Sequence, residues 1–146
     1  STLRVTYGKV KGSNPRDAVT YGYQTHLSGV MEKYIPGDYE FDLPKKLINL
    51  YNTKDYGIYK DKSGDVPVNF TATNHTTGGN SGSPALDAYG NLIGLNFDRQ
   101  WEGTMSDINY DPKLCRNIMV DTKYILFVID KYADAKWLLN EMKIVK

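Results

Sequence analysis

Residues 78–84 read Gly-Gly-Asn-Ser-Gly-Ser-Pro and combine a candidate nucleophile, Ser81, with unusual backbone freedom. Glycine adopts positive φ angles at little cost and lets a backbone approach a substrate closely. Backbone amides held in such a turn can stabilise the negative oxygen that forms during acyl transfer. A Gly/Ser turn without chemistry is the alternative interpretation of these residues taken alone.

A serine nucleophile needs a base to accept its proton, and the chain contains only two histidines, His26 and His75. His75 precedes Ser81 in the same loop, and His26 is followed by Leu-Ser-Gly without a motif that identifies a catalytic base. We expect both to be structural or solvent-facing. The single cysteine, Cys115, excludes an internal disulfide framework and a cysteine-based zinc site.

Alternation of apolar and polar residues predicts the strands that must position this loop. In the first expected strand Leu3, Val5 and Tyr7 share a half-buried face, and residues 12–15 form a turn after it. A hairpin turn at Tyr89-Gly90 joins two strands that follow the loop. Strands are expected at residues 3–10, 18–25, 68–73 (with Val68, Phe70 and Ala72 inward), 85–88, 91–97 and 118–120.

Helical spacing of apolar residues appears in two places. A short helix is predicted over residues 44–51 with Asp42 as its N-cap, followed by a surface excursion over residues 52–66. From Asp121 onward the spacing is helical again, with Asp121 and Asp134 as caps. We therefore expect one domain over residues 1–146, with strands and loops to about residue 120 and a helical tail over residues 121–146.

Composition narrows the class of protein. With 146 residues, 40% hydrophobic and 24% charged, the chain has the composition of an ordinary globular domain. Its net charge of +1 argues against a nucleic-acid-binding protein, and no apolar run approaches the ~20 residues needed to span a bilayer. The first residues lack a signal-peptide pattern, which leaves a cytoplasmic protein, a removed leader or a piece of a longer chain as alternatives.

Residues 79–84, Gly-Asn-Ser-Gly-Ser-Pro, resemble the nucleophile motif Gly-Asp-Ser-Gly-Gly-Pro of chymotrypsin-fold serine peptidases. The resemblance implies that Ser81 is the nucleophile and that the amides of Gly79 and Ser81 form the oxyanion hole. It also implies that the catalytic His and Asp lie elsewhere, because a double barrel runs ~200–250 residues and this chain has strands for about one barrel.

Longer segments are similar to the C-terminal part of the bacterial serine dipeptidyl peptidases, exported enzymes of Gram-negative bacteria that remove dipeptides from free peptide N-termini. The similarity lies in residues 77–84, 90–102 and 120–132, and also in Leu-Arg-Val-Thr-Tyr-Gly-Lys-Val and Tyr-Gly-Tyr-Gln-Thr upstream. Members are about five times this length. The resemblance therefore implies a mainly β chain, one antiparallel barrel half of a chymotrypsin-like double barrel with a helical tail, from a periplasmic enzyme whose N-terminal barrel and helical domain are absent here.

The same resemblance assigns roles to residues after the hairpin. Asp98 would hold the α-amino group of the substrate, and Arg99 would hold an Asp or Glu side chain at its second position, where a glycine accompanies hydrophobic preference. Without the resemblance, Asp98 and Arg99 would be an exposed ion pair at a strand end. His75 is a further candidate donor to the acidic side chain.

The resemblance implies a serine-type dipeptidyl peptidase that releases N-terminal dipeptides ending in Asp or Glu, and we expect this fragment to be inactive alone. A non-catalytic module with a partial substrate pocket and a glutamate-specific endopeptidase are the alternatives. The expected partners are a peptide with a free N-terminus, the N-terminal part of the same enzyme, and a second copy through dimerisation or strand exchange. No cofactor, metal, nucleic acid or membrane span is expected.

Overall fold

The computed structural model describes residues 3–145 and divides into two compact units that interleave along the chain. One unit combines Ser1–Gln24 with Asn69–Asp121, and the other combines Thr25–Val68 with Thr122–Lys146. The strands are β1 (Ser13–Arg16), β2 (Val19–Tyr21), β3 (Gln24–His26), β4 (Pro67–Ala72), β5 (Pro84–Leu86), β6 (Leu92–Arg99) and β7 (Asn117–Asp121). The helices are α1 (Leu27–Glu32), α2 (Lys45–Thr53), α3 (Thr122–Phe127), a π-helix η3 (Val128–Tyr132) and the 3₁₀-helices η1 (Gly57–Tyr59), η2 (Trp101–Asp107) and η4 (Lys136–Glu141).

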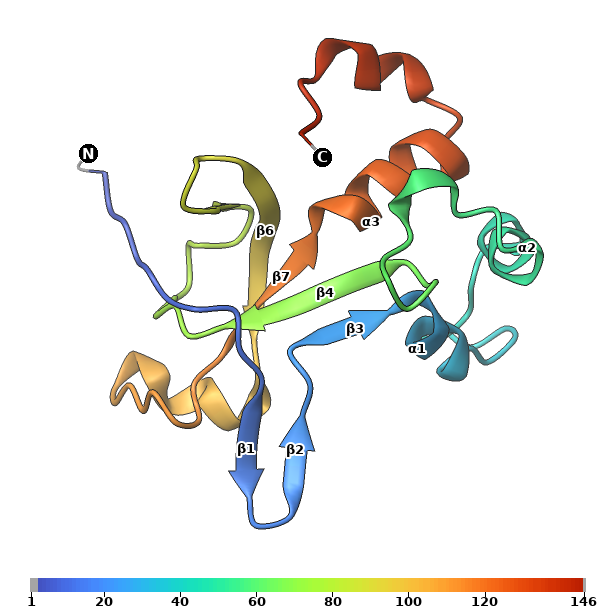
Figure 1. Cartoon of the computed structure of the whole chain (residues 1–146). Coiled ribbons are helices and arrows are strands. Elements are labelled where there is room, and N and C mark those ends of the chain that lie inside the picture. The colour runs from blue at the N-terminus through green and yellow to red at the C-terminus, as the bar shows by residue number, and fades with distance from the viewer. Residues whose placement is uncertain (1–2, 146) are drawn as a thin grey trace. The chain divides into compact units, whose positions relative to one another are not determined.

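The main sheet has the strand order β3-β4-β7-β6-β5, and its β4, β7, β6 and β5 pair in antiparallel fashion. Figure 1 shows β4, β7 and β6 side by side, with β1 and β2 as a separate hairpin. The antiparallel barrel half expected from the sequence is not closed within the described residues, because β3 and β5 form two edges that do not pair with each other. The chain is mainly β, with an open antiparallel sheet.

The first unit has a small apolar core under the centre of the sheet. Phe70, Ala72 and Met119 are buried, and Ala85 and Ile93 pack against them. The inward orientation predicted for the 68–73 strand is confirmed, with Phe70 5% and Ala72 2% exposed. The predicted hairpin is also present as β5 and β6, and the strand predicted at residues 118–120 is β7.

The second unit is built around a larger core that contains two buried tyrosines. Tyr56 and Tyr59 meet the ring of Phe127 edge-on, with centroids 6.3 and 6.4 Å apart. The surface excursion predicted over residues 52–66 is therefore wrong in part, because Tyr56, Tyr59 and Val66 are 1%, 3% and 0% exposed. Polar neighbours mask these three residues in the sequence pattern.

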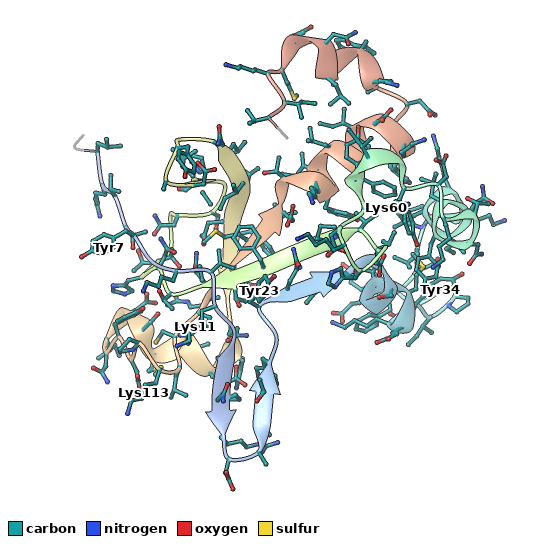
Figure 2. The ribbon with its side chains drawn as sticks, viewed as in Figure 1. Tyr7, Lys11, Tyr23, Tyr34, Lys60 and Lys113 are labelled. Atoms are coloured by element: carbon teal, nitrogen blue, oxygen red, sulfur yellow. The ribbon has the colours of Figure 1, made fainter. Side chains whose placement is uncertain are left out.

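The segment before β1 is not the strand predicted for residues 3–10. Leu3, Val5 and Tyr7 are 88%, 80% and 93% exposed, and Val10 makes only an isolated bridge to Ala72. Figure 2 shows the side chain of Tyr7 projecting away from this segment. Alternation of apolar residues indicates a strand only where a partner strand supplies hydrogen bonds, and the described residues supply none along most of this stretch.

Several predicted boundaries shift by a few residues. The turn expected at residues 12–15 is strand β1, and the chain turns after it, with Ala18 at a φ of 59°. Helix α2 begins after Pro44, and the Asp42 carboxylate bonds only the next amide, that of Leu43, so Asp42 is not its N-cap. The tail is helical in three short pieces; Asp121 ends β7, and Asp134, at a φ of 54°, caps none of them.

Candidate active site

The Ser81 loop, which consists of residues 77–83, places Ser81 at an exposed bend between β4 and β5. Gly79 and Gly82 flank this bend with φ values of 98° and 81°, which side-chain-bearing residues rarely adopt. Asn80 closes the turn, because its Oδ1 accepts the Thr77 amide at 2.9 Å and its own amide donates to the Thr77 carbonyl at 3.2 Å. The backbone and the side chain of Asn80 therefore both hold the loop in a folded turn through Thr77.

Strand β6 anchors the other side of this loop. The Gly82 amide donates to the Asn96 carbonyl at 2.7 Å, and the Asn96 amide donates to the Ser83 carbonyl at 2.9 Å. The Ser81 hydroxyl lies 3.5 Å from the Phe97 carbonyl, its one hydrogen-bond acceptor within the described residues. Ser81 is therefore an exposed hydroxyl on a loop bonded to the strand that carries Asp98 and Arg99.

The amide groups at the bend have different partners. The amides of Asn80, Gly82 and Ser83 all donate to backbone carbonyls. The amides of Gly79 and Ser81 donate to no acceptor among residues 3–145. An oxyanion hole needs backbone donors that are not already bonded within the protein.

Two buried asparagines that the sequence analysis missed lie beneath this loop. Asn96 and Asn117 are 7% and 2% exposed, and the side-chain amide nitrogen of Asn117, Nδ2, donates to Asn96 Oδ1 at 2.8 Å. The side-chain amide of Asn96 in turn donates to the Asn80 carbonyl at 3.4 Å. A polar residue at an inward position of a strand was the available signal, since buried polar groups need partners.

A β-bulge sets the positions of Asp98 and Arg99. Asn96 pairs with Met119 and Asp98 with Ile118, so Phe97 is the extra residue on β6. A bulge bends its strand and redirects the side chains that follow. Asp98 is exposed, and its Oδ1 accepts the Arg99 amide at 2.8 Å.

The Arg99 guanidinium is held by two residues of η2, neither of which the sequence analysis singled out. Its Nη1 donates to Asp107 Oδ1 at 2.9 Å and its Nη2 donates to Asp107 Oδ2 at 2.7 Å. Nη1 also donates to the Ser106 hydroxyl at 2.7 Å. The hydrogen bond between Arg99 and Asp107 lowers the pKa of the Asp107 carboxyl and raises the pKa of the guanidinium.

His75 lies in the same cavity as Arg99. Its Nε2 is 2.9 Å from the Ser106 carbonyl, so this nitrogen donates, and its ring tilts against Tyr110 with centroids 4.9 Å apart. The residues that line the cavity include His75, Arg99, Ser106, Tyr110, Cys115 and Asn117. The structure thus brings His75 and Arg99 together, whereas Gly79, Ser81 and Asp98 are outside that lining.

Among the described residues, neither histidine makes a hydrogen bond with the Ser81 hydroxyl. His26 belongs to the second unit, where its Nε2 pairs with Asp61 Oδ2 at 2.8 Å, and the bonded nitrogen of His75 faces a carbonyl. Among residues 3–145 there is no group of three or more His, Cys, Asp or Glu that could hold a metal ion. In the same part of the chain, no helix has the length and apolar character to cross a membrane.

Comparison with known proteins finds relatives that are much longer than this chain. The Asp/Glu-specific dipeptidyl-peptidase of Flavobacterium psychrophilum is 71% identical over 145 residues, which are 99% of this chain and 20% of that protein. Dipeptidyl-peptidase 7 of Phocaeicola vulgatus is 52% identical over 145 residues, with the same two shares. This chain spans about a fifth of the length of the curated relatives it matches.

Solved structures agree with this comparison. A crystal structure of DPP11 from Porphyromonas endodontalis in complex with the dipeptide Arg-Glu matches with a TM-score of 0.93 and 54% identity, over 96% of this chain and 20% of that chain. A second, in complex with Arg-Asp, matches with a TM-score of 0.92 and 53% identity over 94% of this chain and 20% of that chain. The model of one family, peptidase S46, matches residues 1–144, and the chain belongs to that family.

Proposed function

We propose that this chain is the nucleophile-bearing part of a serine dipeptidyl peptidase that releases N-terminal dipeptides with Asp or Glu at the second position. The observation that carries the proposal is an exposed Ser81 on a loop bonded to β6, the strand whose end presents the Arg99 guanidinium to a cavity. The name and specificity of the relatives, Asp/Glu-specific dipeptidyl-peptidases at 71% and 58% identity, support the same substrate class.

In the proposed reaction the Ser81 hydroxyl attacks the carbonyl carbon after the second residue, and a base from the remainder of the enzyme takes its proton. The free amides of Gly79 and Ser81 stabilise the oxyanion. As the intermediate collapses, the C–N bond breaks and the protonated base gives its proton to the leaving nitrogen, which releases the shortened peptide. Water then hydrolyses the ester to Ser81 and frees the dipeptide. A chymotrypsin-like double barrel, completed by the rest of the chain, and export to the periplasm are parts of this proposal.

Asp98 and Arg99 account for two groups of the substrate, its free α-amino group and the acidic side chain of its second residue. The exposed Asp98 carboxylate would pair with the free α-amino group, and an internal peptide would leave that carboxylate desolvated without a partner. Arg99 has guanidinium donors that no acceptor among the described residues uses, and these could bind an acidic side chain. His75, through its other ring nitrogen, is a further candidate contact for that side chain.

The test uses the full-length enzyme and reporters that release a chromophore from a dipeptide ending in Asp, Glu or Leu. We expect the parent to favour the acidic reporters, Ser81→Ala to lose activity on all of them, and Arg99→Gly to shift preference toward Leu. An Arg99→Gly enzyme that keeps the acidic preference contradicts the role of Arg99. Activity on reporters with a blocked N-terminus would instead support the glutamate-specific endopeptidase.

A further inference from the structure

Arg99 carries more hydrogen-bond donors than its partners in the chain use. A guanidinium has five N–H groups, two on each terminal nitrogen and one on Nε. Asp107 takes one from Nη1 and one from Nη2, and the Ser106 hydroxyl takes the second from Nη1. Within residues 3–145, the Nε–H and the remaining Nη2–H have no acceptor.

The two unused donors form one edge of the planar group. Asp107 and Ser106 contact the end of the guanidinium, which fixes its plane, and the Nε/Nη2 edge is a second fork of the spacing that a carboxylate accepts. Ser106 is 4% exposed, and its carbonyl is bonded by His75 Nε2, so the residue that accepts from Nη1 is itself fixed. The Asp107 carboxylate at the Nη1/Nη2 end of Arg99 therefore leaves the Nε/Nη2 edge available to a second carboxylate.

The negative charge of Asp107 suggests the opposite role, in which Asp107 competes with the acidic side chain of the substrate for Arg99. Asp107 already pairs with the positive charge of Arg99, and Asp98 adds a second carboxylate next to it. If Asp107 competed with the substrate for the same edge of the guanidinium, its removal would strengthen binding of an acidic side chain. The two edges differ, however, and a long arginine side chain without an anchor must lose rotamer freedom on each binding event.

We propose that Asp107 and Ser106 are positioning residues for acidic specificity: they hold the end of the Arg99 guanidinium so that its Nε/Nη2 edge receives the Asp or Glu side chain of the substrate. This inference rests on the proposed function of Arg99. It assigns η2 to the substrate site, through residues that touch Arg99 and do not touch the peptide.

The variant Asp107→Asn in the full-length enzyme tests the inference, because it removes the bidentate pair and keeps the size of the side chain. Arg99 binds the acidic side chain in the ground state and the transition state alike, so we expect KM for the Asp and Glu reporters to rise roughly tenfold with kcat within about twofold. Asp107→Glu, which keeps a carboxylate, should recover most of the loss. Ser106→Ala should raise KM about threefold.

Two further variants separate positioning from a general effect. Glu102→Gln removes the same charge from η2 at a residue with no hydrogen bond or ion pair to Arg99, and it should leave KM for the Glu reporter within about twofold. In an Arg99→Gly background, Asp107→Asn should have no further effect on the acidic reporters, because the residue on which it acts is gone. An equal loss in both backgrounds would overturn the inference.

Two outcomes of the Asp107→Asn measurement would overturn the inference. A lower KM for acidic reporters in Asp107→Asn shows that Asp107 competes with the substrate and overturns the inference, as does an unchanged KM. If Asp107→Asn folds poorly by circular dichroism, Ser106→Ala and its combination with Arg99→Gly decide the question in the same way. A parent enzyme without acidic preference, or one indifferent to Arg99→Gly, overturns the proposed function and this inference with it.

Discussion

The Ser81 hydroxyl is exposed because two neighbouring glycines bend the backbone on either side of it. Positive φ values at Gly79 and Gly82 turn the chain twice within four residues, and the Asn80 side chain closes the turn. A Cβ at either glycine would meet no atom within 4 Å, so the requirement there is conformational and does not come from crowding. The chemistry proposed for Ser81 thus depends on backbone angles that few other residues tolerate.

The carboxylate of Asp61 is the residue-scale feature with the clearest effect on stability. Burial raises its pKa, but hydrogen bonds from Ser63 and His26 outweigh burial and lower the pKa to about 2. Because this pKa lies below the ordinary aspartate value of 3.8, the stabilisation is present above about pH 4 and is lost as the pH falls through about 2.

We expect Asp61→Asn to lower the free energy of unfolding of the second unit, which contains Asp61, by about 1 kcal/mol at pH 7. The difference from the parent should shrink as the pH is lowered from 4 toward 2, because protonation then removes the same charge from the parent. Urea unfolding followed by tyrosine fluorescence at several pH values measures it. The exposed Asp17, with Asp17→Asn, is the control, and an equal loss in both variants would contradict the role given to Asp61.

Residue types in the sequence single out Ser81 as a candidate nucleophile, because it lies in a glycine-rich segment. Arg99 is assigned a role only through the resemblance to the serine dipeptidyl peptidases, and neither argument points to the residues that hold the arginine. Asp107 contacts Arg99 from eight residues away, through a 3₁₀-helix whose sequence shows no helical spacing. Such a contact depends on where η2 begins and ends, and the helix propensities of its residues do not determine those boundaries.

At the scale of elements, prediction worked where one face of a strand is buried against a core. The strands β4, β6 and β7 fit their alternation because Phe70 and Met119 must point into the core. It failed for the segment before β1, where Leu3, Val5 and Tyr7 have no strand beside them among the described residues, and for α1, which is six residues long with Gly29 in its middle. Short elements carry too few residues to display a period.

The close packing of the main sheet depends on a glycine in β6. A Cβ on Gly94 would lie 2.6 Å from the Val120 carbonyl and 2.7 Å from Phe70 Cε1. We therefore expect Gly94→Ala to lower the free energy of unfolding by about 2 kcal/mol, since an overfilled core must move a ring or a strand. Thermal unfolding measures the change.

Gly29→Ala is the matched control for that variant. A Cβ on Gly29 meets no atom within 4 Å, and alanine is the better helix former, so this variant should match or exceed the parent in stability. If Gly94→Ala unfolds at the temperature of Gly29→Ala, β6 does not approach Phe70 and β7 as closely as described. The Ser81 loop, which is bonded to the same strand, should then keep its conformation in Gly94→Ala as well.

At the scale of the whole molecule, the chain is a fifth of the length of its relatives, and its described histidines are both bonded away from Ser81. A serine hydrolase without its base loses several orders of magnitude in rate. We expect the 146-residue chain alone to release no measurable dipeptide from an Asp or Glu reporter. Turnover that Ser81→Ala abolishes would contradict this and would assign the base to His26 or His75.

The same chain, produced alone, leaves Leu3, Val5 and Tyr7 exposed on one extended segment. An unpaired apolar segment with free backbone donors and acceptors favours pairing with another chain. We expect the solution mass to rise above 16.5 kDa with concentration, and Val5→Lys to return it toward that value. Ile58→Lys, at an isolated residue that is 70% exposed, should leave the association unchanged. Sedimentation equilibrium distinguishes the cases: a mass of 16.5 kDa at every concentration would mean that this segment does not drive self-association.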